Sequence, residues 1–303
     1  MIMKHIKYSD YSKLKGFFRH QRYALCVYSL PSILAWSNEY YMPYGAVEND
    51  ALIVAAEFTE QKENRHLILP VSPSREYSPR ELYELAEKLG FKSYWFVPGE
   101  YMERYEKSGI KSLFKITIQK EYEDYVYQAA DLSELKGNKY SQKRNLIHQF
   151  ERDYLSRGRA EVGEINSSVS SECIDFLEKW CKERDCDTGG NDDLACEKKA
   201  AIKTIQHIDI LDVNGIYLRV DGEISAFGIA SYLTDNMGVL HFEKAFAGVK
   251  GLYQYFDNLC AKRLFEGYTY INKESDMNIP GLAKVKLSYH PAMRIKSYRL
   301  DLR

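Results

Sequence analysis

Apolar positions in the first 130 residues fall into short runs of either helical or strand spacing. Apolar residues at 14, 17 and 18 recur at helical spacing, and turn-forming clusters bound the apolar runs that follow. Ser78-Pro79 and Gly90 are typical of the two ends of a helix. The pattern predicts helices over 11–20 and 79–89, and strands over 51–58, 66–69, 94–97 and 114–119. This order predicts a first domain that closes near residue 130.

The second half repeats this pattern with stronger signals. It predicts helices over 140–155, 172–182, 193–208 and 252–266, and strands over 159–165, 216–220, 224–232, 239–247 and 268–274. Asp221-Gly222 supplies the positive φ angles of a two-residue turn, so 216–232 is expected to be a hairpin. The helix 252–266 then connects two parallel strands. The fold class is therefore α+β with a mixed, mostly antiparallel sheet, and periodicity leaves several such plans open.

Length and charge narrow this picture. A chain of 303 residues exceeds the size at which a single core stops growing, so we expect two domains, 1–130 and 131–303. The net charge of −1 argues against the whole protein acting as an electrostatic nucleic-acid binder. No apolar run approaches the roughly 18 residues of a membrane span, and residues 1–10 lack the apolar core of a signal peptide. We expect a cytoplasmic protein.

The six cysteines do not form a regular disulfide framework, so we expect free thiols. Cys181, Cys186 and Cys196 lie close in sequence and leave a metal site open as an alternative. A structural zinc site usually has four ligands with paired C-x-x-C spacing, which is missing here. We therefore predict no metal.

Alternation along strand 239–247 predicts that its apolar side chains, Leu240, Phe242 and Phe246, lie on one face, with His241 and Glu243 on the other. Along strand 268–274, the same rule places Tyr270, Asn272 and Glu274 on one face. If the strands are parallel neighbours, Glu243, Asn272 and Glu274 converge near their carboxyl ends. Two carboxylates there could serve as a general base or hold an amine. The alternative is an ordinary solvated face.

Three basic or glycine-bearing segments suggest phosphate contacts. Gly248 to Gly251, with Lys250, opens a helix and either holds an anion or forms only a tight turn. Lys143 and Arg144 begin a basic helix that either contacts phosphate or is simply solvated. The positive residues of the tail form a basic rim or the polar side of a terminal hairpin: Lys284, Lys286, Arg294, Lys296 and Arg299.

Five sequence blocks resemble the bacterial family of the phosphatidylglycerol lysyltransferase C-terminal domain. They are KYSQKRN (139–145), HFEKA (241–245), GLYQ (251–254), YINKESD (270–276) and KVKLSYHP (284–291). They keep their order, whereas the first 130 residues match only as a tandem copy of the same fold. The resemblance implies two tandem GNAT-like (acetyltransferase-like) domains, as in the Fem-type transferases, which take amino acids from charged tRNA.

The resemblance also implies a set of site residues. Glu243 or Glu274 would be the base or amine anchor, and Asn272 a positioning donor. The substrate- and phosphate-binding candidates are Lys139, Lys143, Arg144, Asn145, Lys250, Gly251, Tyr253, Asp276, Lys284, Lys286 and Tyr289. Aminoacyl-tRNA is the implied donor, and the acceptor is a lipid, a peptidoglycan precursor or a small amine or hydroxyl compound.

Two departures from the family qualify these expectations. The acetyl-coenzyme A signature fits no register around Gly248 or Gly251, because its basic or amide position falls on Ala245 or Gly248. The membrane-spanning half of the lipid lysyltransferases has no counterpart, so a lipid acceptor would be met at the bilayer surface. The alternatives are a coenzyme A-dependent N-acyltransferase and a non-catalytic binding module on the same fold.

Overall fold

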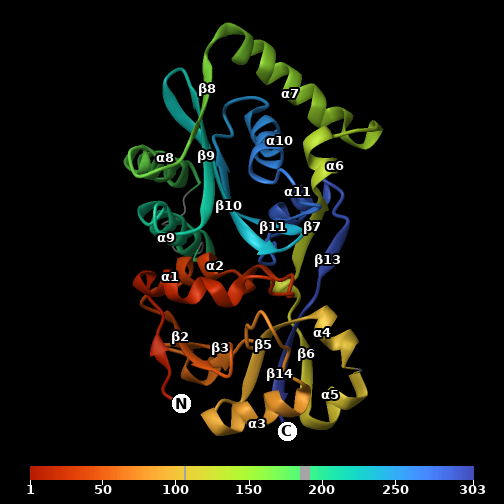
Figure 1. The fold of residues 1–303 in the computed structure, drawn as a ribbon. Helices are drawn as coiled ribbons and strands as arrows, with labels where there is room; N and C mark the ends of the chain where they lie inside the picture. The colour runs from red at the N-terminus through yellow and green to blue at the C-terminus, as the bar shows by residue number, and fades with distance from the viewer. Residues whose placement is uncertain (106, 185–191) are drawn as a thin grey trace.

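The chain forms two separate mixed sheets (Figure 1). Apolar side chains are buried on both of them. The computed structural model describes residues 1–105, 107–184 and 192–303. Cys186 lies outside these ranges, and Cys26, Cys173 and Cys260 are free thiols. Among the described residues, no helix combines the length and apolar character that a membrane span requires.

The first sheet has the strand order β1-β2-β3-β4-β5-β14-β6. Its strands are β1 Lys4–His5, β2 Tyr41–Glu48, β3 Ala51–Phe58, β4 His66–Leu67, β5 Ser93–Pro98, β14 Ser297–Leu302 and β6 Phe114–Ile118. Only β4 and β5 pair in parallel among the strands described here. The helices of this part are α1 Tyr11–Leu14, α2 Leu30–Ala35, α3 Pro79–Leu89, α4 Gly99–Arg104 and α5 Lys107–Leu113.

The second sheet has the order β13-β7-β12-β11-β10-β9-β8. Its strands are β13 Met293–Ile295, β7 Asp124–Gln128, β12 Tyr270–Asn272, β11 Met237–Ala245, β10 Glu223–Thr234, β9 Val213–Val220 and β8 Ala160–Glu164. Its helices are α6 Ala129–Glu134, α7 Ser141–Asp153, α8 Ser170–Glu183, α9 Asp192–Gln206, α10 Leu252–Leu264 and α11 Pro280–Leu287. Figure 1 shows α10 and α7 on the opposite side of this sheet from α8 and α9. Separate apolar clusters fill the two sides.

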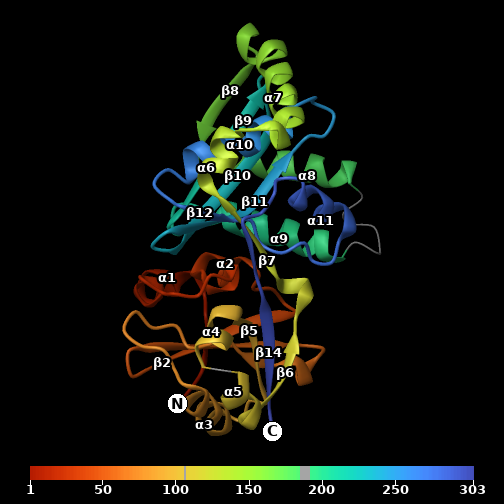
Figure 2. The ribbon, with the colours of Figure 1, turned by 90° about the vertical axis from the view of Figure 1, so that its right-hand side faces the viewer.

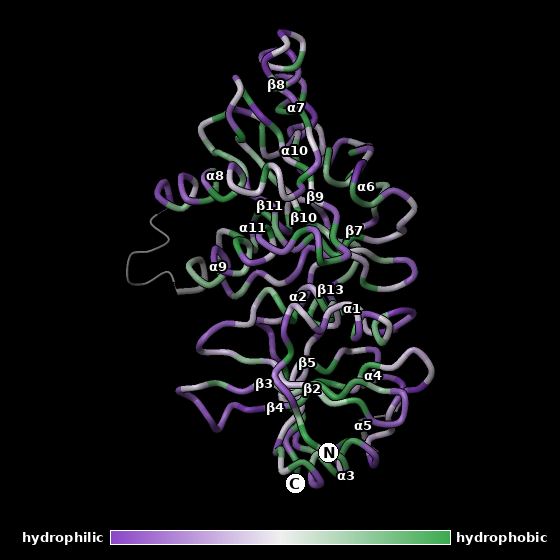
Figure 3. The backbone as a smooth tube through the Cα atoms, turned by 60° about the vertical axis from the view of Figure 1, so that its left-hand side comes forward, coloured by the Kyte–Doolittle hydropathy of each residue, from purple (hydrophilic) through white to green (hydrophobic). Residues whose placement is uncertain are grey.

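The two parts of the molecule are joined by more than one connection. The layer of α1 and α2 lies between the sheets in both views (Figures 1 and 2). The core of the first part extends to Leu233, Met237 and Val239 of the second sheet. Apolar positions follow the inner strands, whereas hydrophilic ones follow much of the outer helices and turns (Figure 3).

The sheets do not divide the chain at residue 130. β7 precedes that residue yet pairs with β12 and β13 in the second sheet. β14 comes at the end of the chain yet lies between β5 and β6 in the first sheet. Tyr298 and Leu300 of β14 are buried there, so the first core needs the last strand of the chain.

Local sequence signals account for several elements. Ser78 and Glu81 form a reciprocal capping box at the start of α3, and Gly90 ends the helix with φ 71°. Asp221 and Gly222 have φ values of 52° and 86°, as the hairpin turn requires. The α+β class with two mixed sheets is confirmed.

Other elements differ from the prediction. The helix expected over 11–20 is α1 followed by a 3-10 turn at Lys15–Phe18. The residue pattern predicted β3 but not its partner β2. It also did not predict α11, which replaces the terminal hairpin expected around Lys284 and Lys286. The strand expected over 268–274 ends at Asn272, because Glu274 adopts φ 58°. Glu274 therefore does not continue the alternation of Tyr270 and Asn272.

Candidate functional site

β11 and β12 separate after a short stretch of parallel pairing. Their register runs from Met237–Tyr270 to Val239–Asn272, which confirms the predicted parallel neighbours. β11 continues to Ala245, whereas β12 ends at Asn272. The side chains that follow these last pairs therefore lie at the open carboxyl end of the two strands, where open α/β sheets place ligands.

A lysine joins two carboxylates at this open end. Lys273 Nζ lies 2.9 Å from Glu243 Oε2 and 2.8 Å from Asp257 Oδ1 of α10. Glu243 and Lys273 each expose 14% of their side chains, and Asp257 exposes 5%. Solvent therefore reaches the Glu243 side of the cluster. We call these three residues the ion triad.

Burial sets the protonation of the ion triad. Burial first, and the nearby charge of Asp257 second, raise the pKa of Glu243 from 4.5 to about 7 against the opposing effect of Lys273. Burial alone would lower the pKa of Lys273, but the two carboxylates outweigh it and raise that pKa. Because one ammonium lies between two carboxylates, the Glu243 carboxyl group exchanges a proton near neutral pH. Glu243 has the properties of a general base.

Asn272 is fully buried and committed to its neighbours. Its Nδ2 donates to Asp124 Oδ2 and to the carbonyl of Ala24, each at 2.8 Å. Its Oδ1 accepts the backbone N–H of Glu274 at 2.7 Å. Burial raises the pKa of Asp124 to about 6. Asn272 thus fixes the chain after β12, and Asp124 is a buried acid that the sequence analysis missed.

Glu274 does not meet Glu243 but pairs with His241. Its Oε1 lies 3.0 Å from His241 Nδ1, and His241 Nε2 lies 2.8 Å from Ser231 Oγ. The register of β10 and β11 shifts at this point, because Ile229 faces Phe242 while Ala230 faces Leu240. His241 is the extra residue of a β-bulge.

The bulge overturns the predicted faces of β11. Leu240 belongs to the apolar cluster that contains Phe256 of α10. Phe242 and Phe246 belong to the cluster that contains Phe176 of α8. The expectation that Leu240, Phe242 and Phe246 share one face is therefore wrong, because one inserted residue reverses the alternation.

Lys286 of α11 is desolvated, and Lys143 of α7 is partly desolvated. Lys286 Nζ donates to the backbone carbonyls of Lys273 and Glu274, and burial lowers its pKa to about 8. Lys143 Nζ lies 3.4 Å from the centre of the Tyr289 ring and 2.9 Å from Ser288 Oγ. Burial also lowers the pKa of Lys143. Lys286 thus supports the backbone of the site and is not presented to an outside phosphate.

The other basic candidates have mostly structural partners or lie on the surface. Lys139 pairs with Asp131 at 3.2 Å. Arg144 donates to the carbonyls of Leu135 and Gly137. Asn145, Lys250 and Lys284 are exposed.

The remaining candidates have packing or hydrogen-bonding roles. The Tyr253 hydroxyl accepts from Trp180 Nε1 at 3.2 Å. Asp276 is buried and accepts from the Tyr125 hydroxyl at 2.6 Å. Gly251 has φ 81°, and a Cβ there would lie 2.2 Å from the Leu146 carbonyl oxygen of α7. This glycine therefore permits α10 to pack on α7, which supports the tight-turn alternative for residues 248–251.

The two mixed sheets, with β11 and β12 separating beyond a short parallel ladder, define an α+β protein whose candidate site lies at the open end of those strands. The chain belongs to the family described as phosphatidylglycerol lysyltransferase, C-terminal, whose model matches residues 21–301.

Two solved structures place this membership in context. A conserved protein of unknown function from Bacteroides thetaiotaomicron is 29% identical, with full coverage of both chains and a TM-score of 0.87. The C-terminal domain of a putative lysylphosphatidylglycerol synthetase from Agrobacterium fabrum is 15% identical, covers 85% of this chain and 83% of its own, and has a TM-score of 0.60. The second likeness concerns the fold alone. No curated protein matches the chain.

Proposed function

We propose that this protein transfers an aminoacyl or acyl group from an ester donor, aminoacyl-tRNA, to an amine or hydroxyl acceptor. The acceptor is a lipid met at the bilayer surface, a peptidoglycan precursor or a small molecule. The ion triad at the open end of β11 and β12 carries the proposal, since it places a carboxyl group with a pKa near 7 beside a fixed ammonium. Membership of the lysyltransferase C-terminal family supports the reaction class.

Glu243 is the general base of the proposed reaction. It removes the proton of the acceptor N–H or O–H as the acceptor attacks the ester carbonyl carbon. The bond from that carbon to the ribose oxygen then breaks, and Glu243 returns the proton to this oxygen. Lys273 fixes the carboxylate and stabilises negative charge that develops beside it. Asp257 keeps Lys273 charged and in place.

Three lysines, two of them exposed and one half-buried, are the proposed contacts for the tRNA backbone. Lys284 lies on the exposed side of α11. Lys143 reaches from α7 to Ser288, which directly follows α11. Lys250 is exposed in the turn before α10. Phosphate contacts made by such lysines weaken steeply as salt concentration rises.

The direct test is transfer of labelled amino acids from a mixed pool of charged tRNA. The acceptors are phosphatidylglycerol vesicles and, separately, soluble peptidoglycan precursors and small amines. We expect Glu243→Gln to lower transfer at least ~100-fold, because a general base contributes about that factor or more. Glu223→Gln, an exposed glutamate on β10 of the same sheet, is the matched control. Equal transfer by Glu243→Gln and wild type would remove Glu243 from the mechanism.

A thermal-shift comparison tests the donor. A ligand at 100 times its Kd adds about 2.7 kcal/mol of stability. We expect stabilisation by charged tRNA that declines with salt, and none by acetyl-coenzyme A. Stabilisation by acetyl-coenzyme A alone would replace the proposed donor with a coenzyme A thioester.

A further inference from the structure

A hydrogen-bonded chain of side chains runs from Glu274 to the space between the two parts of the molecule. Glu274 Oε1 lies 3.0 Å from His241 Nδ1, His241 Nε2 lies 2.8 Å from Ser231 Oγ, and Ser231 Oγ lies 3.1 Å from Ser29 Oγ. A carboxylate only accepts, so Nδ1 carries the imidazole hydrogen and Nε2 is an acceptor. The Ser231 hydroxyl has two acceptors within reach, and His241 Nε2 at 2.8 Å is nearer than the Tyr232 carbonyl oxygen at 3.2 Å. The Ser231 oxygen then accepts from Ser29.

This direction is the one that activates a serine. The imidazole nitrogen that accepts from a serine hydroxyl can take its proton, and a carboxylate on the other nitrogen orients the ring and stabilises the imidazolium that forms. The backbone of Glu274, which carries this carboxylate, is itself held in place. The backbone N–H of Glu274 donates to Asn272, and its carbonyl accepts from Tyr125 N–H at 3.1 Å and from Lys286.

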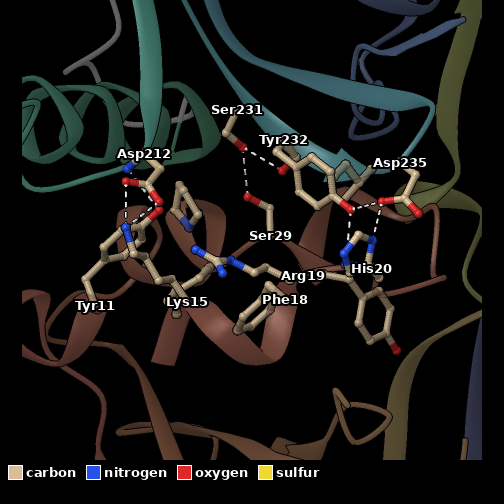
Figure 4. Close-up of a pocket in the computed structure, with 14 residues that line it drawn as sticks. Tyr11, Lys15, Phe18, Arg19, His20, Ser29, Asp212, Ser231, Tyr232 and Asp235 are labelled. Atoms are coloured by element: carbon tan, nitrogen blue, oxygen red, sulfur yellow. Dashed lines mark hydrogen bonds and ion pairs between the residues drawn. The ribbon is translucent and has the colours of Figure 1, made fainter. Parts of the chain in front are cut away.

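Ser231 opens into a cleft between the two parts of the chain (Figure 4). The cleft has a volume of about 460 Å³, and Phe18, Leu30 and Leu233 contribute apolar walls. Figure 4 shows the hydroxyls of Ser29 and Ser231 directed toward each other, with the Arg19 guanidinium extending between the two sides. Among the described residues, no carboxylate lies within ion-pair distance of Arg19, whereas Lys15 pairs with Asp212 and His20 with Asp235.

We propose that Ser231 and His241 are the nucleophile and base of a second active site, positioned by Glu274, which cleaves small apolar esters bound in this cleft. Ser231 Oγ attacks the ester carbonyl carbon while His241 Nε2 takes its proton. The bond to the alcohol oxygen breaks, and the alcohol leaves with that proton. Water then attacks the acyl-serine, His241 accepts a proton from the water and returns it to Ser231, and the free acid departs.

This site differs from the proposed transferase site. Glu243 and the ion triad play no part in it, and aminoacyl-tRNA is not its substrate. Arg19 lines the same cleft and provides a positive charge for the anionic oxygen. Ser29 orients the Ser231 hydroxyl through a hydrogen bond and is not itself the nucleophile.

Reaction with an alkyl fluorophosphonate tests the serine directly, because an activated serine oxygen displaces fluoride from phosphorus and retains the label. We expect mass spectrometry to find the label on Ser231. We expect hydrolysis of p-nitrophenyl butyrate to fall at least ~100-fold in Ser231→Ala and His241→Ala. Ser225→Ala is the matched control, because Ser225 is a buried serine of the same strand outside the chain of hydrogen bonds.

Glu274 is tested as a positioning residue by the pH dependence of hydrolysis. Glu274→Gln should lower the rate and move the low-pH limb of the rate profile to lower pH, because that limb reports protonation of the His241 base. Glu274→Asp should restore part of the rate. A wild-type protein that takes up no label on Ser231 overturns the proposal, even if the alanine variants fail to fold. So does a Ser231→Ala variant that hydrolyses the ester as fast as Ser225→Ala.

Discussion

Lys273 Nζ lies 2.9 Å from Glu243 Oε2, although the strands that carry the two residues pair only as far as Val239 and Asn272. The ion pair thus spans the separation of β11 and β12 just beyond the last backbone pair. Asp257 joins it from α10, the helix that connects the two strands. β11, α10 and the residue that directly follows β12 therefore contribute one charge each to the same place.

The raised pKa of Glu243 predicts a pH-dependent effect of Glu243→Gln on stability. The pKa rises from 4.5 to about 7 in the folded state, so the folded protein binds more protons than the unfolded chain across this interval. Wild-type protein therefore loses stability from this group as the pH rises from about 4.5 to 7. Glutamine does not ionise, so the Glu243→Gln variant does not lose stability in this way.

We expect the Tm of Glu243→Gln minus that of wild type to increase between pH 5 and pH 8, as measured by calorimetry. Glu223→Gln, at an exposed position, should show no such trend. A Tm difference that stays constant or falls with pH would show that burial does not control this carboxyl group.

The contribution of Lys286 to stability depends on pH in the opposite sense. Burial lowers its pKa from 10.5 to about 8, so the unfolded chain binds more protons in that interval. The contribution of Lys286 to stability therefore improves as the pH rises from 8 to 10.5. We expect wild-type protein to gain stability relative to Lys286→Met over this range in urea titrations. Lys284→Met on the exposed side of α11 is the control, and an equal trend there would refute the assignment.

The ion triad shows where sequence reasoning ends. The carboxylate Glu243 and the parallel strands could be predicted, because alternation and the βαβ order depend on local pattern. Asp257 carried a signal that was overlooked, since it lies three residues before Cys260, on the apolar side of α10. No local pattern predicted the part played by Lys273, because the direction of its side chain depends on where β12 ends and on the backbone conformation of Glu274.

The pairing of strands far apart in sequence could not be predicted either. Nothing in the pattern of residues 297–302 indicates that they enter the first sheet, because strand partners far apart in sequence leave no local periodicity. The bulge at His241 was hidden for a related reason. One extra residue is visible only against the register of β10.

Gly251 tests whether the turn before α10 is a packing device. Its φ of 81° strains any other residue, and a Cβ would lie 2.2 Å from the Leu146 carbonyl oxygen. We expect Gly251→Ala to lower the free energy of unfolding by about 2 kcal/mol or more in urea titrations. A Cβ at Gly248 meets no atom within 4 Å, so Gly248→Ala should change stability little. Similar losses for both variants would contradict the packing role.

Leu300 tests the dependence of the first part of the molecule on the end of the chain. It is 0% exposed in β14, between β5 and β6. Truncation of a buried leucine to alanine costs about 2–5 kcal/mol, so Leu300→Ala should be strongly destabilised in urea titrations. Leu287→Ala removes the same atoms from a residue that is 51% exposed, and it should change stability by less than about 0.5 kcal/mol.

The spectroscopic probe decides which part of the molecule is affected. Trp95 of β5 lies in the first sheet, whereas Trp180 of α8 packs on the second. Single-tryptophan versions of the Leu300→Ala variant therefore report the two parts separately. We expect the Trp95 signal to be lost at lower urea than in the matched wild type. An unchanged Trp95 transition, with a shift only at Trp180, would show that β14 does not support the first core.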